Sequence, residues 1–514
     1  MKKIIAGALC AALFASLFSG ISYAQNKQVW SKAKAEFEKD KDTQTTQTLL
    51  DIIKKVDEAV YPEKFEDAAK LLVDLIQTQF DDKGNLRTEQ SVLDAAIAAL
   101  SKTGGEKTQA LLLKEAKNKK TIEFARACII EAMGAMPNEK ILEFLKETIS
   151  PKTQPVLRIS ALKAAGSAGP PEDFIDVLIE TLKAEEWQAR LAAINSLGKS
   201  SGDKATAGLI NAFKDENGRL RENYREALKK LTGVDEGLNG KEWAKWWEEK
   251  NKPTGEKKDD SNNFAKTQID EPTYFDEPIL SKSIVFIIDV SGSMLDPSGV
   301  VPKTTESGEA PEIPIPRDAT PEQKKKLESL KETNDKLDPG SKINAVKKEL
   351  ANTILFLSED TYFAIVFYST TPFEWKKNLV KANAVNKIEA VENVTGQNAD
   401  GATNIFDSLL MAFDMLPETK ANPKDDKKKD DKKKGDTTVK TQDLLGADTI
   451  YLLTDGIPNR GGITTGQGIT AEISKMNLVR KIKIFTIGVG TDVDGGFLSD
   501  LAAKNGGKYI KVGQ

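Results

Sequence analysis

The sequence predicts a multidomain protein, with an N-terminal α-solenoid followed by a C-terminal α/β domain built on a doubly wound, mostly parallel sheet. Residues 27–250 repeat a helical pattern closed by glycines, as stacked helix pairs do. In residues 281–514, apolar strands alternate with helices, which is the pattern of a parallel sheet covered on both faces. The chain has 514 residues, a length that fits two or three domains.

Residues 1–24 are predicted to be a secretory signal peptide. Lys2 and Lys3 form a basic start, and an apolar stretch follows up to a cleavage site after Ala24. Lipidation of Cys10 is disfavoured because Leu9, rather than a small residue, precedes it. No other stretch approaches the roughly 18 apolar residues that span a bilayer. We therefore expect an exported protein, periplasmic or extracellular, with no integral membrane span after cleavage.

Five glycines close similar helical segments in the first region, at intervals of 30, 32, 32 and 35 residues. After each of the first four, a short turn leads to a second apolar helix. Two helices per period are typical of an α-solenoid, in which small residues allow close packing and the glycine serves as a C-cap. The pattern resembles HEAT repeats, most clearly in RLAAINSLG, and a non-repetitive helical bundle is the alternative. The glycines are Gly104, Gly134, Gly166, Gly198 and Gly233.

The solenoid is expected to end in a helix at 237–251. Trp243, Trp246 and Trp247 share one face of this helix because they lie at i, i+3 and i+4. We interpret them as a cap on the last repeat, with an aromatic docking patch as the alternative. Residues 251–280 are polar with three prolines and are interpreted as a linker.

The segment SIVFIIDVSGSM predicts a ligand site at the start of the second domain. An apolar strand ends at Asp289, Ser291 and Ser293 follow at alternate positions, and Gly292 allows a sharp turn. Open α/β sheets place their ligands at the carboxyl ends of strands. Carboxylate and hydroxyl oxygens suit Mg²⁺, Mn²⁺ or Ca²⁺. A metal-free turn from strand to helix is the alternative.

This Asp-x-Ser-Gly-Ser pattern resembles the first loop of the metal-ion-dependent adhesion site in von Willebrand factor type A domains. Two later segments fit the family's order of loops: residues 401–404 open a helix with Gly-Ala-Thr-Asn, and an apolar strand ends in Thr-Asp-Gly at 454–456. The resemblance covers about residues 281–514. It implies one divalent cation, Mg²⁺ first and Mn²⁺ or Ca²⁺ as alternatives. It also implies five site residues, which are Asp289, Ser291, Ser293, Thr403 and Asp455.

Two insertions interrupt this second domain. Residues 296–340, beside the first metal loop, are interpreted either as a flexible surface loop or as a lid or specificity element, with a helix at 320–336. Residues 418–442 form a mixed-charge tract that favours disorder. The expected strands are 283–290, 361–369, 373–380, 448–455, 482–490 and a last strand near the C-terminus. The expected helices are 342–357, 383–394, 404–416, 470–481 and 495–505.

Composition excludes several kinds of site. The chain has no histidine, which excludes Ser-His-Asp and Cys-His catalysis and histidine-ligated zinc sites as usually built. Cys128, the one cysteine after the signal peptide, lies in an apolar helix and is expected in the core. A formal net charge of −4 does not indicate nucleic acid binding. The glycine-rich segment 488–496 lacks the residues of a phosphate or calcium loop and is interpreted as a turn.

These patterns predict an exported, non-enzymatic adaptor or scaffold that binds proteins. By the resemblance, a cation held mainly by hydroxyls attracts an acidic side chain from a protein partner, and exchange of water for that group shifts the helix at 495–505. The solenoid offers a second binding surface. Two alternatives remain at this point: a metal-dependent phosphoester hydrolase, although no P-loop occurs, and a structural scaffold whose solenoid is the sole binding surface.

Overall fold

A computed structural model describes most of the chain in two compact units. The first unit reaches Leu178 and includes residues 195–201, while the second includes residues 179–194, the remaining helical repeats and the sheet. The predicted signal peptide and nearly all of the insertion at 418–442 lie outside the described residues. The residues described are 28–29, 31–39, 45–59, 65–81, 86–167, 169–252, 271–299, 312–418 and 444–513.

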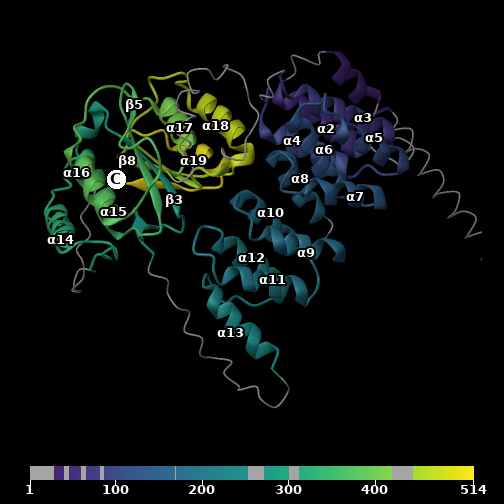
Figure 1. Ribbon diagram of the computed structural model, residues 1–514. Helices are drawn as coiled ribbons and strands as arrows, with labels where there is room; N and C mark the ends of the chain where they lie inside the picture. Colours follow the sequence, from purple (N-terminus) through teal and green to yellow (C-terminus); the bar gives the residue numbers. More distant parts are fainter. Residues whose placement is uncertain are drawn as a thin grey trace, which may run out of the picture. The chain divides into compact units, whose positions relative to one another are not determined.

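Paired helices form the N-terminal half of the described chain, as the repeat predicts (Figure 1). Each glycine-closed segment becomes the first helix of a pair, and each following apolar segment becomes the second. Cys128 is buried in one of these helices, and burial raises the pKa of its thiol. The helices are α2 Thr46–Ala59, α3 Phe65–Thr78, α4 Gln90–Ser101, α5 Glu106–Lys117, α6 Glu123–Met133, α7 Glu139–Thr148, α8 Pro155–Ala165, α9 Glu172–Thr181, α10 Trp187–Leu197, α11 Asp203–Phe213, α12 Arg221–Thr232 and α13 Gly240–Lys250.

Two of the repeat glycines, Gly134 and Gly166, bring neighbouring helices close together. Gly134 and Gly166 occupy C-caps with φ of −61° and −95°, which other residues adopt as easily. A Cβ on Gly134 would lie 2.3 Å from the carbonyl oxygen of Ala164, and one on Gly166 would lie 2.3 Å from Ser196 Cβ. Only Gly233, of these three, has the left-handed φ of +77° that the expected capping role requires. At Gly134 and Gly166, close approach between helices therefore explains the glycine better than a need for positive φ at the C-cap does.

Substituting Gly134 by alanine should destabilise the first unit. The added methyl group meets backbone atoms of α8, which cannot move independently, so we expect a loss of about 2 kcal/mol in the free energy of unfolding. Gly104→Ala is the matched control because its Cβ would make an ordinary 3.5 Å contact with the Phe65 ring. Urea denaturation of both variants measures the difference. Equal losses would contradict close approach as the reason for the glycine at 134.

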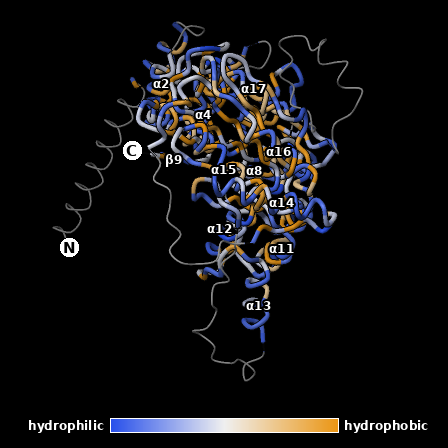
Figure 2. Tube along the Cα trace, turned by 90° about the vertical axis from the view of Figure 1, so that its left-hand side faces the viewer, coloured by the Kyte–Doolittle hydropathy of each residue, from blue (hydrophilic) through white to orange (hydrophobic). Residues whose placement is uncertain are grey.

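Helix α13 closes the helical part of the second unit. Trp243 is fully buried, its Nε1 donates to Gly237 O at 2.9 Å, and its ring meets that of Trp246 edge-on at 5.9 Å. A Cβ on Gly240 would lie 2.2 Å from Phe213 O, so α13 begins in close contact with the end of α11. The opposite face carries exposed lysines and glutamates, and Figure 2 draws this helix largely in the hydrophilic colour. Burial of Trp243 fits the capping interpretation.

The sheet of the second unit has the strand order β5-β4-β3-β7-β8-β9, with β6 also paired to β4. All neighbours from β4 to β9 in this order run parallel, and the short strands β5 and β6 run antiparallel to β4. The predicted doubly wound, mostly parallel sheet is thus confirmed. The strands are β3 Ser283–Asp289, β4 Tyr362–Tyr368, β5 Pro372–Glu374, β6 Val380–Lys381, β7 Thr449–Thr454, β8 Lys483–Val489 and β9 Tyr509–Val512.

Helices cover both faces of this sheet (Figure 1). Along β3, Ile284, Phe286 and Ile288 enter one core, whereas Val285 and Ile287 enter the other, so every residue of the apolar run is buried. Helices α14, α15 and α16 pack on the first face, and α17, α18 and α19 pack on the second. Their bounds are α14 Pro321–Asp335, α15 Lys342–Phe356, α16 Ala384–Gly396, α17 Ile405–Phe413, α18 Gly466–Arg480 and α19 Gly495–Lys504.

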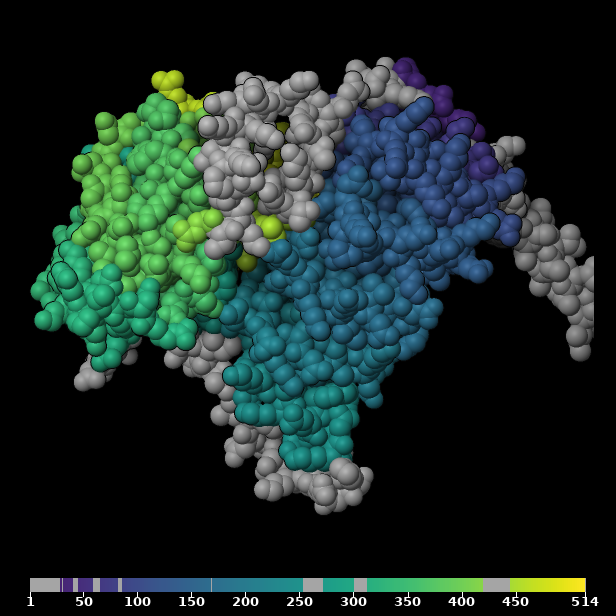
Figure 3. All heavy atoms as spheres, in the orientation of Figure 1, coloured from purple at the N-terminus to yellow at the C-terminus, as the bar shows by residue number. Residues whose placement is uncertain are grey.

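The first insertion and the predicted linker both contain regular secondary structure. Helix α14, expected at 320–336, begins with a capping box between Thr320 and Gln323, and Figure 3 shows its teal-green atoms at the surface. The end of the stretch interpreted as a linker forms a hairpin of β1 Thr273–Tyr274 and β2 Glu277–Pro278. The ring of Tyr274 is fully buried against Phe286 and Tyr451.

The single edge strand expected at 373–380 is instead two short strands, since an edge strand has only one neighbour to satisfy.

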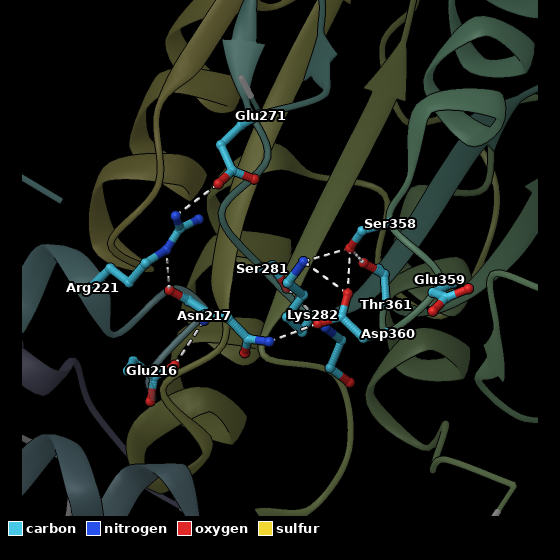
Figure 4. Close-up of polar contacts among 12 residues, drawn as sticks. Glu216, Asn217, Arg221, Glu271, Ser281, Lys282, Ser358, Glu359, Asp360 and Thr361 are labelled. Atoms are coloured by element: carbon cyan, nitrogen blue, oxygen red, sulfur yellow. Dashed lines mark hydrogen bonds and ion pairs between the residues drawn. The ribbon is translucent and has the colours of Figure 1, made fainter. Parts of the chain in front are cut away.

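Within the second unit, the loop between α11 and α12 contacts the amino-terminal edge of the sheet (Figure 4). Asn217 Nδ2 donates to Asp360 Oδ2 at 2.6 Å, and Lys282 Nζ lies 3.0 Å from the other oxygen of the same carboxylate. Arg221 forms a buried ion pair with Glu271 at 2.7 Å. These contacts lie at the edge opposite the one where β3 and β7 end.

Candidate metal centre

The predicted site residues lie at the carboxyl-terminal edge of the sheet. Asp289 ends β3, Asp455 directly follows β7, and these strands are adjacent and parallel, with Ile288 beside Leu453. From β3 the chain passes to β4 on one side, and it later returns to β7 on the other side. Such a reversal opens a crevice at the strand ends, which is where α/β sheets bind ligands. Thr403 reaches this edge from the loop that precedes α17.

Hydrogen bonds and close contacts join four of the five predicted residues to one another. Ser291 Oγ and Ser293 Oγ are 3.2 Å apart, and Ser293 Oγ donates to Asp455 Oδ1 at 2.8 Å. The backbone N–H of Ser291 donates to Asp289 Oδ1 at 2.8 Å. Thr403 completes the set, because a Cβ placed on the glycine after Asp455 would lie 3.5 Å from Thr403 Oγ1 and 3.9 Å from Ser293 Oγ. The structure therefore brings all five residues to one edge.

Asp289 is buried and organises the loops beneath the hydroxyls. Its Oδ2 accepts hydrogen bonds from Tyr368 Oη at 3.1 Å and from Thr454 Oγ1 at 2.8 Å. Burial raises the pKa of Asp289 to about 6, against the opposing effect of its hydrogen bonds with Ser291. The Tyr368 hydroxyl also donates to Leu453 O at 3.0 Å, so it connects the carboxylate to β7. This arrangement suits an aspartate that positions its surroundings rather than one that faces solvent.

Thr403 is held by the loop that follows β7. Its backbone N–H donates to Asn459 Oδ1 at 2.8 Å, and its carbonyl accepts from the backbone N–H groups of Asn459 and Arg460. The next residue, Asn404, caps α17 by accepting from Asp407 N and donates through Nδ2 to Thr370 O. The second and third loops are thus tied together before any ligand binds.

Sequence reasoning missed one charged group at this edge, the side chain of Lys342. Its Nζ donates to Asp455 Oδ2 at 2.8 Å, and both side chains are almost completely buried. The Asp455 carboxylate therefore receives a hydroxyl from Ser293 on one oxygen and an ammonium on the other. Lys342 is 113 residues away in the sequence and belongs to no metal motif.

The side chains fit a hard divalent cation. No cluster of three or more histidine, cysteine, aspartate or glutamate residues suited to a metal occurs in the described part of the chain. A cation at this edge would therefore depend on hydroxyl oxygens, which are ligands that Mg²⁺, Mn²⁺ and Ca²⁺ accept. Asp289, Ser291, Thr403 and Asp455 are buried, whereas Ser293 is exposed, so the donor set opens to solvent on the Ser293 side.

Sequence comparisons agree with this topology. Residues 337–510 match the von Willebrand factor type A domain, and residues 142–229 match HEAT repeats. The chain contains a von Willebrand factor type A (VWA) domain preceded by HEAT repeats. The matched VWA segment includes Thr403 and Asp455 and begins after the loop that carries the other three predicted ligands.

The chain is similar to parts of longer proteins. It is 31% identical over 181 residues to inter-alpha-trypsin inhibitor heavy chain H4 of Bos taurus, covering 34% of this chain and 17% of that protein. It is 26% identical over 238 residues to heavy chain H3 of Mus musculus, covering 46% and 19%. The matched region thus spans less than a fifth of either relative. A solved VWA protein from Catenulispora acidiphila aligns over 46% of this chain and 39% of its own, at 18% identity and a TM-score of 0.26.

Among the residues that the structure describes, no helix is long and apolar enough to cross a membrane. The predicted signal peptide is not among these residues.

Proposed function

We propose that this chain is an exported, non-enzymatic adaptor or scaffold that binds a protein partner through a metal-ion-dependent adhesion site in its VWA domain. The observation that carries the proposal is the meeting of three loops, which together bring three hydroxyls and two buried aspartates to the carboxyl-terminal edge of the sheet. A bound divalent cation would supply a Lewis-acidic open position for a carboxylate. Neutral hydroxyls compensate little of its charge, so an acidic side chain of a partner is the expected last ligand.

Each residue of the site has its own role in this proposal. Ser291, Ser293 and Thr403 would hold the cation through their hydroxyl oxygens. Asp289 and Asp455 would act through water, because their carboxylates are engaged with neighbouring protein groups. Mg²⁺ is the first expectation, with Mn²⁺ or Ca²⁺ as alternatives, since all three accept oxygen ligands.

The surroundings of the site support recognition of a protein rather than a small substrate. Leu295 and Ile457 are 61% and 60% exposed, the most exposed large apolar side chains among the described residues. They follow Ser293 and Asp455 by two positions each, so they flank the donor set. Exposed apolar side chains beside a polar centre are typical of protein interaction sites. The preferred partner segment would therefore carry a glutamate or aspartate next to apolar residues, while the HEAT repeats offer a second surface.

Calorimetric titration of the metal-stripped mature protein with Mg²⁺, Mn²⁺ and Ca²⁺ tests the site. We expect about one ion per chain in the parent protein, and roughly 10- to 100-fold weaker binding after Asp289→Ala, because the loops lose the carboxylate that organises them. Asp500→Ala is the control, since it removes the same charge from an exposed ion pair with Lys504 on α19. Equal binding by the parent and by Asp289→Ala would overturn the proposed ligand set.

Two further results would change the functional class. Turnover of phosphate esters that disappears in the Asp289→Ala protein would indicate a hydrolase instead of an adaptor. A structural role for the site predicts that Asp289→Ala lowers the melting temperature yet leaves partner binding intact in the folded protein. Metal-dependent binding of a partner to the parent alone supports the adaptor.

A further inference from the structure

Lys342 is built into the proposed metal site from the first position of α15. Its side chain is 4% exposed, and its backbone N–H donates to Asp296 O at 2.9 Å, which fixes it beside the first metal loop. A Cβ on Gly490 would lie 2.9 Å from Lys342 Cε, so the absence of a side chain there leaves room for the lysine. The 2.8 Å contact with Asp455 thus results from several constraints and not from a free surface side chain.

The ammonium and a divalent cation would require the same carboxylate. Lys342 Nζ donates to Asp455 Oδ2, while Ser293, one of the proposed ligands, donates to Asp455 Oδ1. Two cations a few ångströms apart repel strongly when the site is shielded from water. Conversely, a buried carboxylate that loses its only nearby cation is costly. Lys342 therefore favours the metal-free site and opposes entry of a divalent ion.

We propose that Lys342 is a tethered counter-cation that stabilises the metal-free adhesion site and lowers its affinity for divalent cations. Ion binding then requires the ammonium to leave Asp455. Asp296 offers a destination, since its Oδ2 lies 3.9 Å from the same nitrogen and its side chain is 63% exposed. This inference rests on the proposed function, because it concerns regulation of the same site. Lys342 therefore raises the ion concentration at which the site fills, relative to a site with the hydroxyl ligands alone.

Lys342→Met is the direct test because methionine keeps the apolar stem and removes the charge. Titration with Mg²⁺ should show roughly tenfold tighter binding than in the parent protein, since one repulsive charge is lost. The melting temperature without metal should fall, because Asp455 remains buried without its cation. Added Mg²⁺ should raise the melting temperature of the variant by more than it raises that of the parent.

Lys348→Met provides the matched control on the same helix. It removes the same charge, but Lys348 Nζ donates to Asp335 O and Leu337 O, away from the site carboxylates. The Mg²⁺ affinity of this variant should stay within about twofold of the parent value, because Lys348 shares no hydrogen-bond partner in the described structure with the proposed ligands.

A second measurement uses the unaltered chain and so does not depend on folding of a variant. Reductive methylation of Lys342, followed by mass spectrometry, should be slow without metal and faster at saturating Mg²⁺, because the ammonium leaves its buried position. The methylation rate of Lys348 should not change. A methylation rate of Lys342 that does not change with Mg²⁺ would contradict displacement of the ammonium from Asp455.

The outcomes separate this inference from the proposed function. If the parent binds Mg²⁺ and Lys342→Met binds equally or more weakly, the counter-cation role is wrong and the metal site stands. If only Lys342→Met binds, the counter-cation role is supported and the lysine has replaced the ion in the natural chain. If neither protein binds any of the three ions, both proposals fail.

Discussion

Replacing Arg219 by alanine is expected to lower the free energy of unfolding of the second unit by about 3–5 kcal/mol. Its Nη1 donates to the carbonyl oxygens of Asp448, directly before β7, and of Lys481, two residues before β8. The guanidinium also lies 4.1 Å from the centre of the Trp187 ring. Removing the side chain takes these donors away from two backbone carbonyls, one of them on buried Asp448, and takes a positive charge away from the Asp448 carboxylate, whose pKa burial already raises.

Chemical denaturation followed by tryptophan fluorescence measures this effect, since Trp187 reports on the altered contact. Arg225→Ala is the matched control, because Arg225 pairs with Asp235 in a partly exposed bidentate contact on the same part of the chain. It should cost at most about 1 kcal/mol. Arg219→Met separates the two causes, as it keeps apolar contact with the ring and removes the donors. A loss no larger than that of Arg225→Ala would show that the contact does not stabilise the unit.

The fold was predictable because its signals are local. A strand buried on both faces must be apolar at every position, so SIVFII and TIYLL could be recognised without knowing their neighbours. The repeat glycines were found by spacing, and Gly134, Gly166 and Gly233 do occupy C-caps, but the close contact that Gly134 and Gly166 make with the next repeat was not predictable. Arg219 and Tyr274 could not be assigned, because each contacts residues more than ten positions away that no local pattern specifies. Tyr274 also lies in a polar stretch that hides its burial.

In the candidate site, too, some residues are marked by local sequence patterns and others are brought in only by the fold. Asp289, Ser291 and Ser293 lie in one short motif, and Thr403 and Asp455 could be chosen by the order of the loops. Tyr368 and Lys342 reach the site only through the strand order and the placement of α15. Lys342 nevertheless left a signal in the sequence. A lysine in the first turn of a helix is opposed by the helix dipole, so its presence there indicates a partner elsewhere in the fold.

Lys387 is a buried cation whose removal is expected to stabilise the protein at neutral pH. It is 1% exposed on α16, and its Nζ donates to Leu355 O at 2.8 Å. Burial lowers the pKa of this ammonium to about 8, only partly offset by Glu359. Keeping it charged at pH 7 therefore costs about 3 kcal/mol of stability relative to the unfolded chain. Lys387→Met should recover about 2 kcal/mol of this, since it also gives up one hydrogen bond worth about 1 kcal/mol.

The pH dependence provides the decisive control. Between pH 8 and pH 10.5, native Lys387 is largely neutral while the unfolded chain still binds the proton, so the contribution of Lys387 to the stability of the parent rises with pH across this window. The advantage of Lys387→Met is thus fully present below pH 8 and lost as the pH approaches 10.5. Melting temperatures of both proteins at pH 7, 9 and 10.5 measure the difference, in which other titrating groups cancel. A difference in melting temperature that does not change with pH would show that the charge of Lys387 does not destabilise the protein. Leu355 O and its surroundings would then solvate the ammonium as well as water does.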